Sequence, residues 1–110
     1  MVELRVREDS RQRLSSLFAT GHAGWTESGE DVVCAAVSAI LQAAWLGLSE
    51  VAHIDIVASR SDGRLELSWP ASARTDPGVA AIVATAALSV ERIALQYPDH
   101  VRVIRERHDG

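Results

Sequence analysis

Two long apolar stretches constrain this chain more than any other feature of its sequence. Val32–Leu48 is interrupted only by Ser38, Gln42 and Gly47, and Pro77–Val90 is built mostly of Ala and Val. Because an α-helix rises about 1.5 Å per residue, the apolar part of neither stretch spans the roughly 30 Å of hydrocarbon in a bilayer. Both stretches are therefore predicted to be buried helices of a domain that makes no membrane contact.

Short segments in which apolar and polar residues alternate surround these helices. Such alternation is typical of a strand that buries one of its faces. Ser61-Asp62-Gly63 stands between two of the segments, and Asp-Gly in that position is a strong signal of a β-hairpin. The predicted strands are Val2–Arg7, Leu14–Thr20, Ile54–Ala58, Leu65–Trp69 and Val101–Arg105.

Capping residues predict where the helices begin and end. Asp31 is expected to be the N-cap of the first helix, because its carboxylate can accept hydrogen bonds from the unpaired amides of the first turn. Asp76 followed by Pro77 marks the start of the second helix, and Pro98 stops it. The element order is then β-β-α-β-β-α-β. We expect one domain over residues 1–110, of α+β class, with a mainly antiparallel sheet packed with two helices.

Both predicted helices are apolar around much of their circumference. One stripe of the second helix consists of Val79, Ile82, Val83, Ala86, Val90 and Ile93. Its other faces also carry small or apolar residues, namely Ala80, Ala81, Ala84, Ala87 and Leu88. One sheet face cannot cover such helices, and a short chain has few other elements to do so. The sequence therefore predicts a homodimer, with two-fold symmetry as the commonest arrangement.

The charge balance argues against nucleic acid as a direct partner. The chain carries 11 basic and 15 acidic residues, for a formal net charge of -4, whereas a phosphate backbone attracts a basic surface. The single cysteine excludes an internal disulfide. The N-terminal residues alternate apolar and charged side chains and form no apolar signal-peptide core, so the expected compartment is the cytoplasm.

A cysteine and a histidine carry the clearest chemical signal. If Asp31 caps the helix, Cys34 is its third residue, where the partial positive charge of the helix N-terminus favours a thiolate. His22, at the end of the preceding strand, can take the thiol proton and later protonate a leaving amine. Backbone amides at the same helix end can hold an oxyanion. Spacing alone also allows a structural role, because a cysteine in an apolar helix is most often a small buried hydrophobe.

Two short motifs enclose these residues. They read Thr-Gly-His-Ala over residues 20–23 and Gly-Glu-Asp-Val-Val-Cys-Ala-Ala-Val-Ser over residues 29–38. Together they resemble the signature of the ribosomal-processing cysteine proteases, the Prp family, which usually has Ile in place of Val32. The resemblance implies a small dimeric protease in which His22 is the base and Cys34 the nucleophile. The implied substrate is large-subunit ribosomal protein number twenty-seven, from which this family removes a short N-terminal extension.

Three further positions of the signature are given supporting roles, each beside a simpler alternative. Gly21 permits a backbone conformation or a close approach that a side chain would block. Asp31 either orients His22 or only caps the helix. Ser38 hydrogen-bonds either near the thiol or to its own helix.

A predicted loop, Ala23–Glu30, joins the two motifs. Gly24 and Gly29 would let it open and close over a bound peptide, as loops over active sites often do. Trp25 would either cover the substrate or pin the loop to the core. No cofactor is expected, and no spacing of Cys, His and carboxylate residues indicates a metal site.

Two functions of other classes compete with the protease. One is a non-catalytic ribosome-assembly or regulatory partner in which Cys34 is buried or sensitive to oxidation. The other is a thiol-dependent hydrolase or acyltransferase acting on a small thioester. A redox switch usually has a second, resolving cysteine, which this sequence lacks.

Overall fold

A computed structural model describes residues 1–21 and 28–108, with the backbone alone for residues 28–31. These residues form one mixed sheet with the strand order β3-β4-β2-β1-β5. The strands are β1 (Val2–Glu8), β2 (Leu14–Thr20), β3 (Val57–Ser61), β4 (Arg64–Ser68) and β5 (Val101–Arg107). The helices are α1 (Ser28–Leu46), which continues into a π-helical turn at Gly47–Val51, and α2 (Pro77–Gln96), which follows a 3-10 turn at Ala71–Ala73.

The sheet is mainly antiparallel. β1 pairs with β5 in parallel, while the β1–β2, β2–β4 and β3–β4 pairs are antiparallel. The predicted fold class and element order are confirmed. The two β-hairpins need only short turns, whereas the parallel strand β5 is reached by the crossover through α2.

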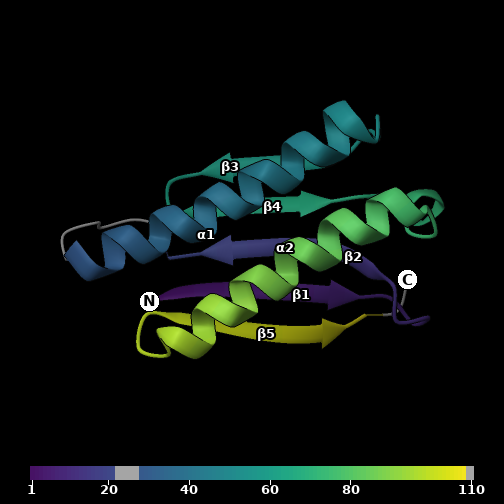
Figure 1. The fold of residues 1–110 in the computed structure, drawn as a ribbon. Coiled ribbons are helices and arrows are strands. Elements are labelled where there is room, and N and C mark those ends of the chain that lie inside the picture. The colour runs from purple at the N-terminus through teal and green to yellow at the C-terminus, as the bar shows by residue number, and fades with distance from the viewer. Residues whose placement is uncertain (22–27, 109–110) are drawn as a thin grey trace.

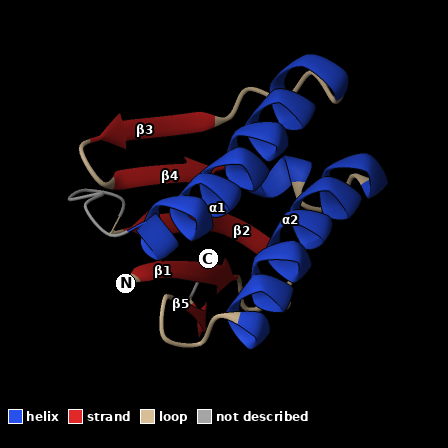
Figure 2. Ribbon diagram, turned by 60° about the vertical axis from the view of Figure 1, so that its left-hand side comes forward, coloured by secondary structure: helices blue, strands red, loops and turns tan. Residues whose placement is uncertain are grey.

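Both helices cover the same face of the sheet (Figure 1, Figure 2). Val2, Leu4 and Val6 of β1 point to that face and are buried, as the alternation predicts. The opposite face is polar: Arg5 pairs with Glu3 and with Glu106 of β5. A hydrogen bond from Arg102, with Arg5 nearby, holds the pKa of Glu3 below its usual value. The hydrophobic core therefore lies in one layer, between the sheet and the helices.

The first helix starts earlier than predicted. α1 begins at Ser28, so Asp31 is the fourth helical residue, and the prediction that it is the N-cap is wrong. Gly29 and Glu30, predicted to belong to the loop, are helical as well. The residue types account for the earlier start, because serine is common at helix N-termini and acidic residues in the first turn interact favourably with the helix dipole.

The start of β3 also differs from the prediction. Its alternation extends back to Ile54, yet the strand begins at Val57. His53 has a positive φ of 55°, and the Ile56 amide donates to the Ile54 carbonyl at 3.0 Å. This tight turn uses backbone groups that a strand ladder would need.

The second helix has the predicted ends. The Asp76 carboxylate accepts a hydrogen bond from the Val79 amide at 2.9 Å, and Pro77 is the first helical residue. The helix ends at Gln96, just before Pro98. Its core-facing residues follow the predicted stripe, except that Ala87, assigned to an outer face, is fully buried.

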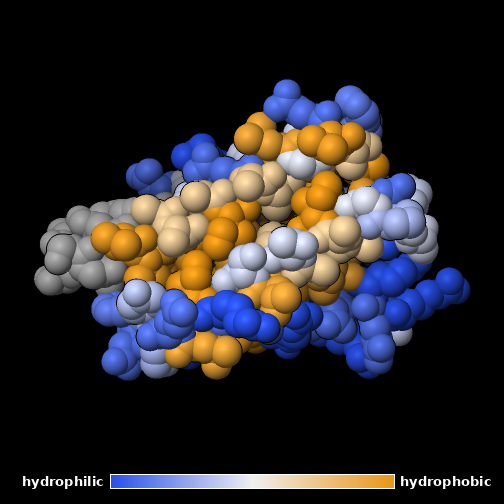
Figure 3. All heavy atoms as spheres, in the orientation of Figure 1, coloured by the Kyte–Doolittle hydropathy of each residue, from blue (hydrophilic) through white to orange (hydrophobic). Residues whose placement is uncertain are grey.

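The outer faces of the helices are apolar and uncovered in the single chain. Figure 3 shows apolar side chains gathered over α1 and α2, bordered by hydrophilic residues. Val32, Leu46, Leu88 and Leu95 are each more than half exposed.

Both helices are long and apolar enough to cross a membrane, over Val32–Val51 and Pro77–Gln96. The length of these helices therefore does not exclude a membrane span, contrary to the prediction from the sequence. Core helices of soluble proteins pass the same test, and the inner faces of these two helices complete the core over the sheet. We therefore describe them as core helices.

A buried ion cluster holds the turn between β1 and β2. Asp9 is fully buried, and its carboxylate accepts hydrogen bonds from the Arg11 and Arg13 amides at 2.9 and 3.1 Å. It also pairs with the guanidinium groups of Arg13 and Arg74 at 3.0 and 3.1 Å. Burial by itself would raise the pKa of Asp9, but these bonds outweigh it and hold the pKa well below the ordinary value of 3.8.

We expect Asp9→Asn to lower the urea midpoint at pH 7 by about 1 M, because it leaves two arginines without their carboxylate. A carboxyl group with a depressed folded-state pKa stabilises the protein above its unfolded pKa, and this contribution is lost as the pH falls towards the folded pKa. The difference in urea midpoint between the variant and the parent should therefore become smaller below about pH 4. Urea titrations from pH 7 to pH 2.5 measure it. Asp55→Asn, at an exposed position, is the control, and an equal effect of both substitutions would contradict the prediction.

Candidate active site

Gly21 ends β2 in a conformation that requires glycine. Its φ is +97°, and a Cβ built on it would lie 2.2 Å from the carbonyl oxygen of Met1. The Gly21 amide donates to the Gly63 carbonyl at 2.9 Å, which joins the end of β2 to the turn of the β3–β4 hairpin. The predicted close approach at Gly21 is confirmed.

Cys34 lies on α1 among the core residues. Its side chain is 5% exposed, and its neighbours in the helix include the buried Val33 and Val37. The first half of α1 and the Gly21 end of β2 lie at the same end of the molecule (Figure 1). Cys34 belongs to this half of α1.

The position of Cys34 within the helix weakens the effect of the helix dipole on its thiolate. Since α1 begins at Ser28, Cys34 lies in the second turn and not the first. The field of the helix terminus falls off within the first turn. The helix end therefore stabilises a thiolate less than predicted, and formation of the thiolate depends more on a nearby proton acceptor.

Ser38 follows Cys34 by one helical turn on the same face. Its hydroxyl accepts a hydrogen bond from Gln42 Nε2 at 2.9 Å, a partner that the sequence did not indicate. Ser38 and Gln42 border the β3–β4 hairpin. A catalytic contribution of Ser38 stays a prediction.

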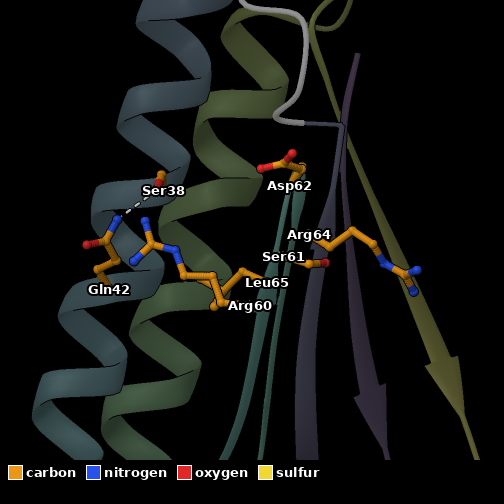
Figure 4. A pocket seen from close by; sticks show the side chains of 8 residues that line it. Ser38, Gln42, Arg60, Ser61, Asp62, Arg64 and Leu65 are labelled. Carbon is orange, nitrogen blue, oxygen red and sulfur yellow. Dashed lines mark hydrogen bonds between the residues drawn. The ribbon is translucent and has the colours of Figure 1, made fainter.

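A polar pocket of about 360 Å³ lies between α1 and this hairpin. Ser38 and Gln42 form its helix side, and Arg60, Asp62 and Leu65 are among the residues of its strand side (Figure 4). From the sequence, Asp62 was assigned only to the hairpin turn, and Arg60 and Gln42 to no role. No local pattern reveals them, because helix and hairpin meet only in the folded chain.

Several predicted site residues lie outside the described part of the chain. They are His22, Gly24 and Trp25, so their roles stay predictions. Gly29 and Asp31 have helical backbones, which corrects their local structure and leaves their part in catalysis untested. Within residues 1–21 and 32–108, whose side chains the structure describes, no group of three or more His, Cys, Asp and Glu side chains is placed to hold a metal ion.

Comparison with known proteins identifies the family. Residues 1–102 match the family described as Cysteine protease Prp. The chain belongs to the Prp family. Prp proteins are cysteine proteases, and this chain is therefore an enzyme of that class. A Prp relative, the ribosomal processing cysteine protease Prp of Mycoplasma genitalium, is 31% identical over 97 residues, which cover 84% of this chain and 90% of the relative.

Solved structures show the same fold. A Streptococcus mutans protein has a TM-score of 0.86 at 24% identity, over 98% of this chain and 96% of that chain. The ribosomal processing protease Prp of S. aureus, solved with a substrate peptide, has a TM-score of 0.81 at 18% identity, over 96% and 99%. The Prp fold therefore extends over nearly the whole chain.

Proposed function

We propose that this protein is a cytoplasmic endopeptidase that removes the short N-terminal extension of large-subunit ribosomal protein number twenty-seven during ribosome assembly. The observation that carries the proposal is the single cysteine of a Prp-family chain, in the half of α1 that lies at the end of the sheet where β2 ends. The name of the Mycoplasma genitalium relative and the substrate peptide held by S. aureus Prp support a ribosomal-protein peptide as the substrate.

In this mechanism, His22 takes the proton of the Cys34 thiol. The thiolate attacks the scissile carbonyl carbon, and the C–N bond breaks as His22 returns the proton to the leaving nitrogen. The products of this step are a free amine and a thioester on Cys34. A water molecule then loses a proton to His22 and attacks the thioester. The C–S bond breaks and releases the carboxylic acid product, and His22 returns its proton to the sulfur of Cys34.

The burial of Cys34 favours one competing function, that of a non-catalytic assembly partner with a structural cysteine. The two functions differ in the reactivity of the thiol. A nucleophile activated by a neighbouring base is alkylated rapidly at neutral pH, whereas a buried structural thiol is inert.

We expect iodoacetamide at pH 7 to modify Cys34 in the native protein, and His22→Ala to slow this reaction by about tenfold or more. The histidine should matter greatly because the second-turn position of Cys34 gives the thiolate little help from the helix dipole. Mass spectrometry of timed samples measures the rate. His53→Asn, at an exposed histidine with a positive φ, should react as fast as the parent. Modification that requires urea would support the structural cysteine instead.

We also propose that the protein acts as a homodimer that covers the apolar outer faces of its helices. A groove between α1 and α2, lined by Gly47, Ala81 and Ile82 among others, lies on this face, and Leu88 of α2 is more than half exposed. Burial of such a surface against a second copy removes apolar area from water.

Light scattering at micromolar concentration is expected to give twice the chain mass of 11.9 kDa. Ala81→Glu and Leu88→Glu should shift the protein to the monomer, because each places a charge in the apolar surface. Ala71→Glu, at an exposed position in the 3-10 turn before α2, should leave the dimer intact. A parent protein that scatters as a monomer would contradict the proposal.

A further inference from the structure

Another cavity lies at the end of the sheet where β2 begins, opposite the Gly21 end. Its volume is about 270 Å³, and residues of the β1–β2 turn and of the first turns of α2 line it. The seven residues of β2 separate the two ends by about 23 Å, and α2 begins at the same end as β2 (Figure 1). The cavity is therefore remote from the candidate active site.

One wall of this cavity is apolar. Leu14 and Trp69 form its sheet side, and Val79, Val83 and Ala84 form its helix side. Trp69 is 3% exposed, and the only donor of its indole, the Nε1 group, donates to the Leu14 carbonyl at 2.8 Å. The ring therefore has no polar group left for a ligand and offers apolar contact alone.

The other wall carries the guanidinium groups of Arg13 and Arg74. Both pair with the buried Asp9 carboxylate, at 3.0 and 3.1 Å. The same carboxylate accepts hydrogen bonds from the Arg11 and Arg13 amides. These four hydrogen bonds fill the acceptor sites of an ionised carboxylate. Asp9 thus has no acceptor site left for the terminal nitrogens of Arg13.

Arg13 can therefore bind a second anion. Its Nε group is engaged by Asp9, whereas the two terminal nitrogens carry the remaining N–H donors of the guanidinium. The side chain is 27% exposed, so a ligand can reach it. Among the described residues that line the cavity, none is acidic. A guanidinium group forms its strongest hydrogen bonds with carboxylates and phosphates, and the apolar wall favours a carboxylate that carries a hydrocarbon group.

From these observations we infer that the cavity binds a small apolar carboxylate. Arg13 holds the carboxylate through its terminal nitrogens, and the hydrocarbon part packs against Trp69 and α2. The cavity is smaller than the roughly 300–1,000 Å³ of sites for drug-sized ligands. The ligand is accordingly a small free acid or the C-terminal residue of a peptide. Because the site is remote from the end of β2, it does not hold the bond that the proposed peptidase cuts.

The test is a titration of the ¹⁵N-labelled protein followed by NMR, with the indole N–H signal of Trp69 as the reporter. The Trp69→Phe variant identifies this signal by its loss. We expect 4-methylpentanoate to shift it with a Kd of about 1 mM or lower. The uncharged 4-methylpentanamide and the short acid acetate should each bind at least about tenfold more weakly, because the first lacks the carboxylate and the second the apolar group.

N-acetyl-leucine distinguishes the two sources of the ligand. It presents the same branched side chain and a carboxylate in the form of a peptide C-terminus. A lower Kd for N-acetyl-leucine than for 4-methylpentanoate would identify the C-terminal residue of a peptide, and a lower Kd for 4-methylpentanoate would identify a free acid. If neither acid gives a saturable shift, the site is overturned.

Two variants change the charge and the space of the cavity separately. Arg13→Gln removes the charge and should weaken binding of either acid by about tenfold or more. It also removes a partner of Asp9, so urea unfolding must show that the variant is folded. Ala84→Leu fills the cavity from an exposed position of α2, leaves the ion cluster intact, and should weaken binding to a similar extent.

The matched control is Ala71→Leu, the same enlargement at an exposed position in the 3-10 turn before α2. It should bind both acids as tightly as the parent. Binding by Ala84→Leu that equals the parent, or an amide that binds as tightly as the acid, would contradict the inference. Neither result bears on the proposed peptidase function, which is measured by cleavage.

Discussion

Cys34→Ala and Cys34→Ser are expected to lose peptide-bond cleavage by about a thousandfold or more, because neither alanine nor serine offers a thiolate at neutral pH. Both side chains fit the space of Cys34, which lies among small and branched apolar residues of the core. The fold should therefore be retained. The assay follows, by mass spectrometry, the removal of the N-terminal extension from purified ribosomal protein number twenty-seven.

Circular dichroism and urea unfolding of the same variants separate lost chemistry from lost structure. A valid result requires a far-ultraviolet spectrum and a urea midpoint close to those of the parent. Val37→Ala, one turn away and fully buried, provides the opposite control: it leaves a cavity and lowers stability while keeping the thiol. Cleavage by Cys34→Ala within tenfold of the parent would remove Cys34 from the mechanism.

Gly21→Ala is expected to destabilise the protein by about 3 kcal/mol or more. The new Cβ would lie 2.2 Å from the Met1 carbonyl oxygen, and the residue would have to keep a φ of +97°. The clash involves backbone on both sides, so either β1 or the end of β2 must move. Since residue 22 follows directly, cleavage should fall together with stability. Urea unfolding and the extension-removal assay measure the two effects.

Gly63→Ala separates the backbone clash from the conformational strain. Gly63 also has a positive φ, of 69°, and lies in the turn between β3 and β4. Its substitution should cost only the strain of a left-handed alanine, about 1–2 kcal/mol. Equal losses in the two variants would show that the contact with Met1 does not determine the need for glycine at position 21.

Most of the fold could be predicted because its signals are local. Alternation over Val2–Arg7 gives the buried face of β1, and the Asp76 carboxylate caps α2 through the nearest amides. The prediction failed at the start of α1, because Asp31 is an acceptable capping residue and residue preference alone does not reveal that it lies inside the first turn of a helix that begins at Ser28. Because the helix begins earlier, Cys34 lies in its second turn and not in its first. The helix dipole therefore stabilises a Cys34 thiolate less than predicted.

The sequence by itself determined the elements, their order, the single cysteine and the motifs of residues 20–38, since each depends on neighbours in the chain. Only the tertiary structure decided that both helices cover one face of the sheet and that the turn at Gly63 meets Gly21. It also decided that Arg60 of β3 lies opposite Gln42 of α1. These contacts join residues many positions apart, and they form because the helices must bury their apolar stripes on the sheet. The local sequence pattern shows that the helices have apolar stripes to bury. Which residues then come into contact depends on how the whole chain packs.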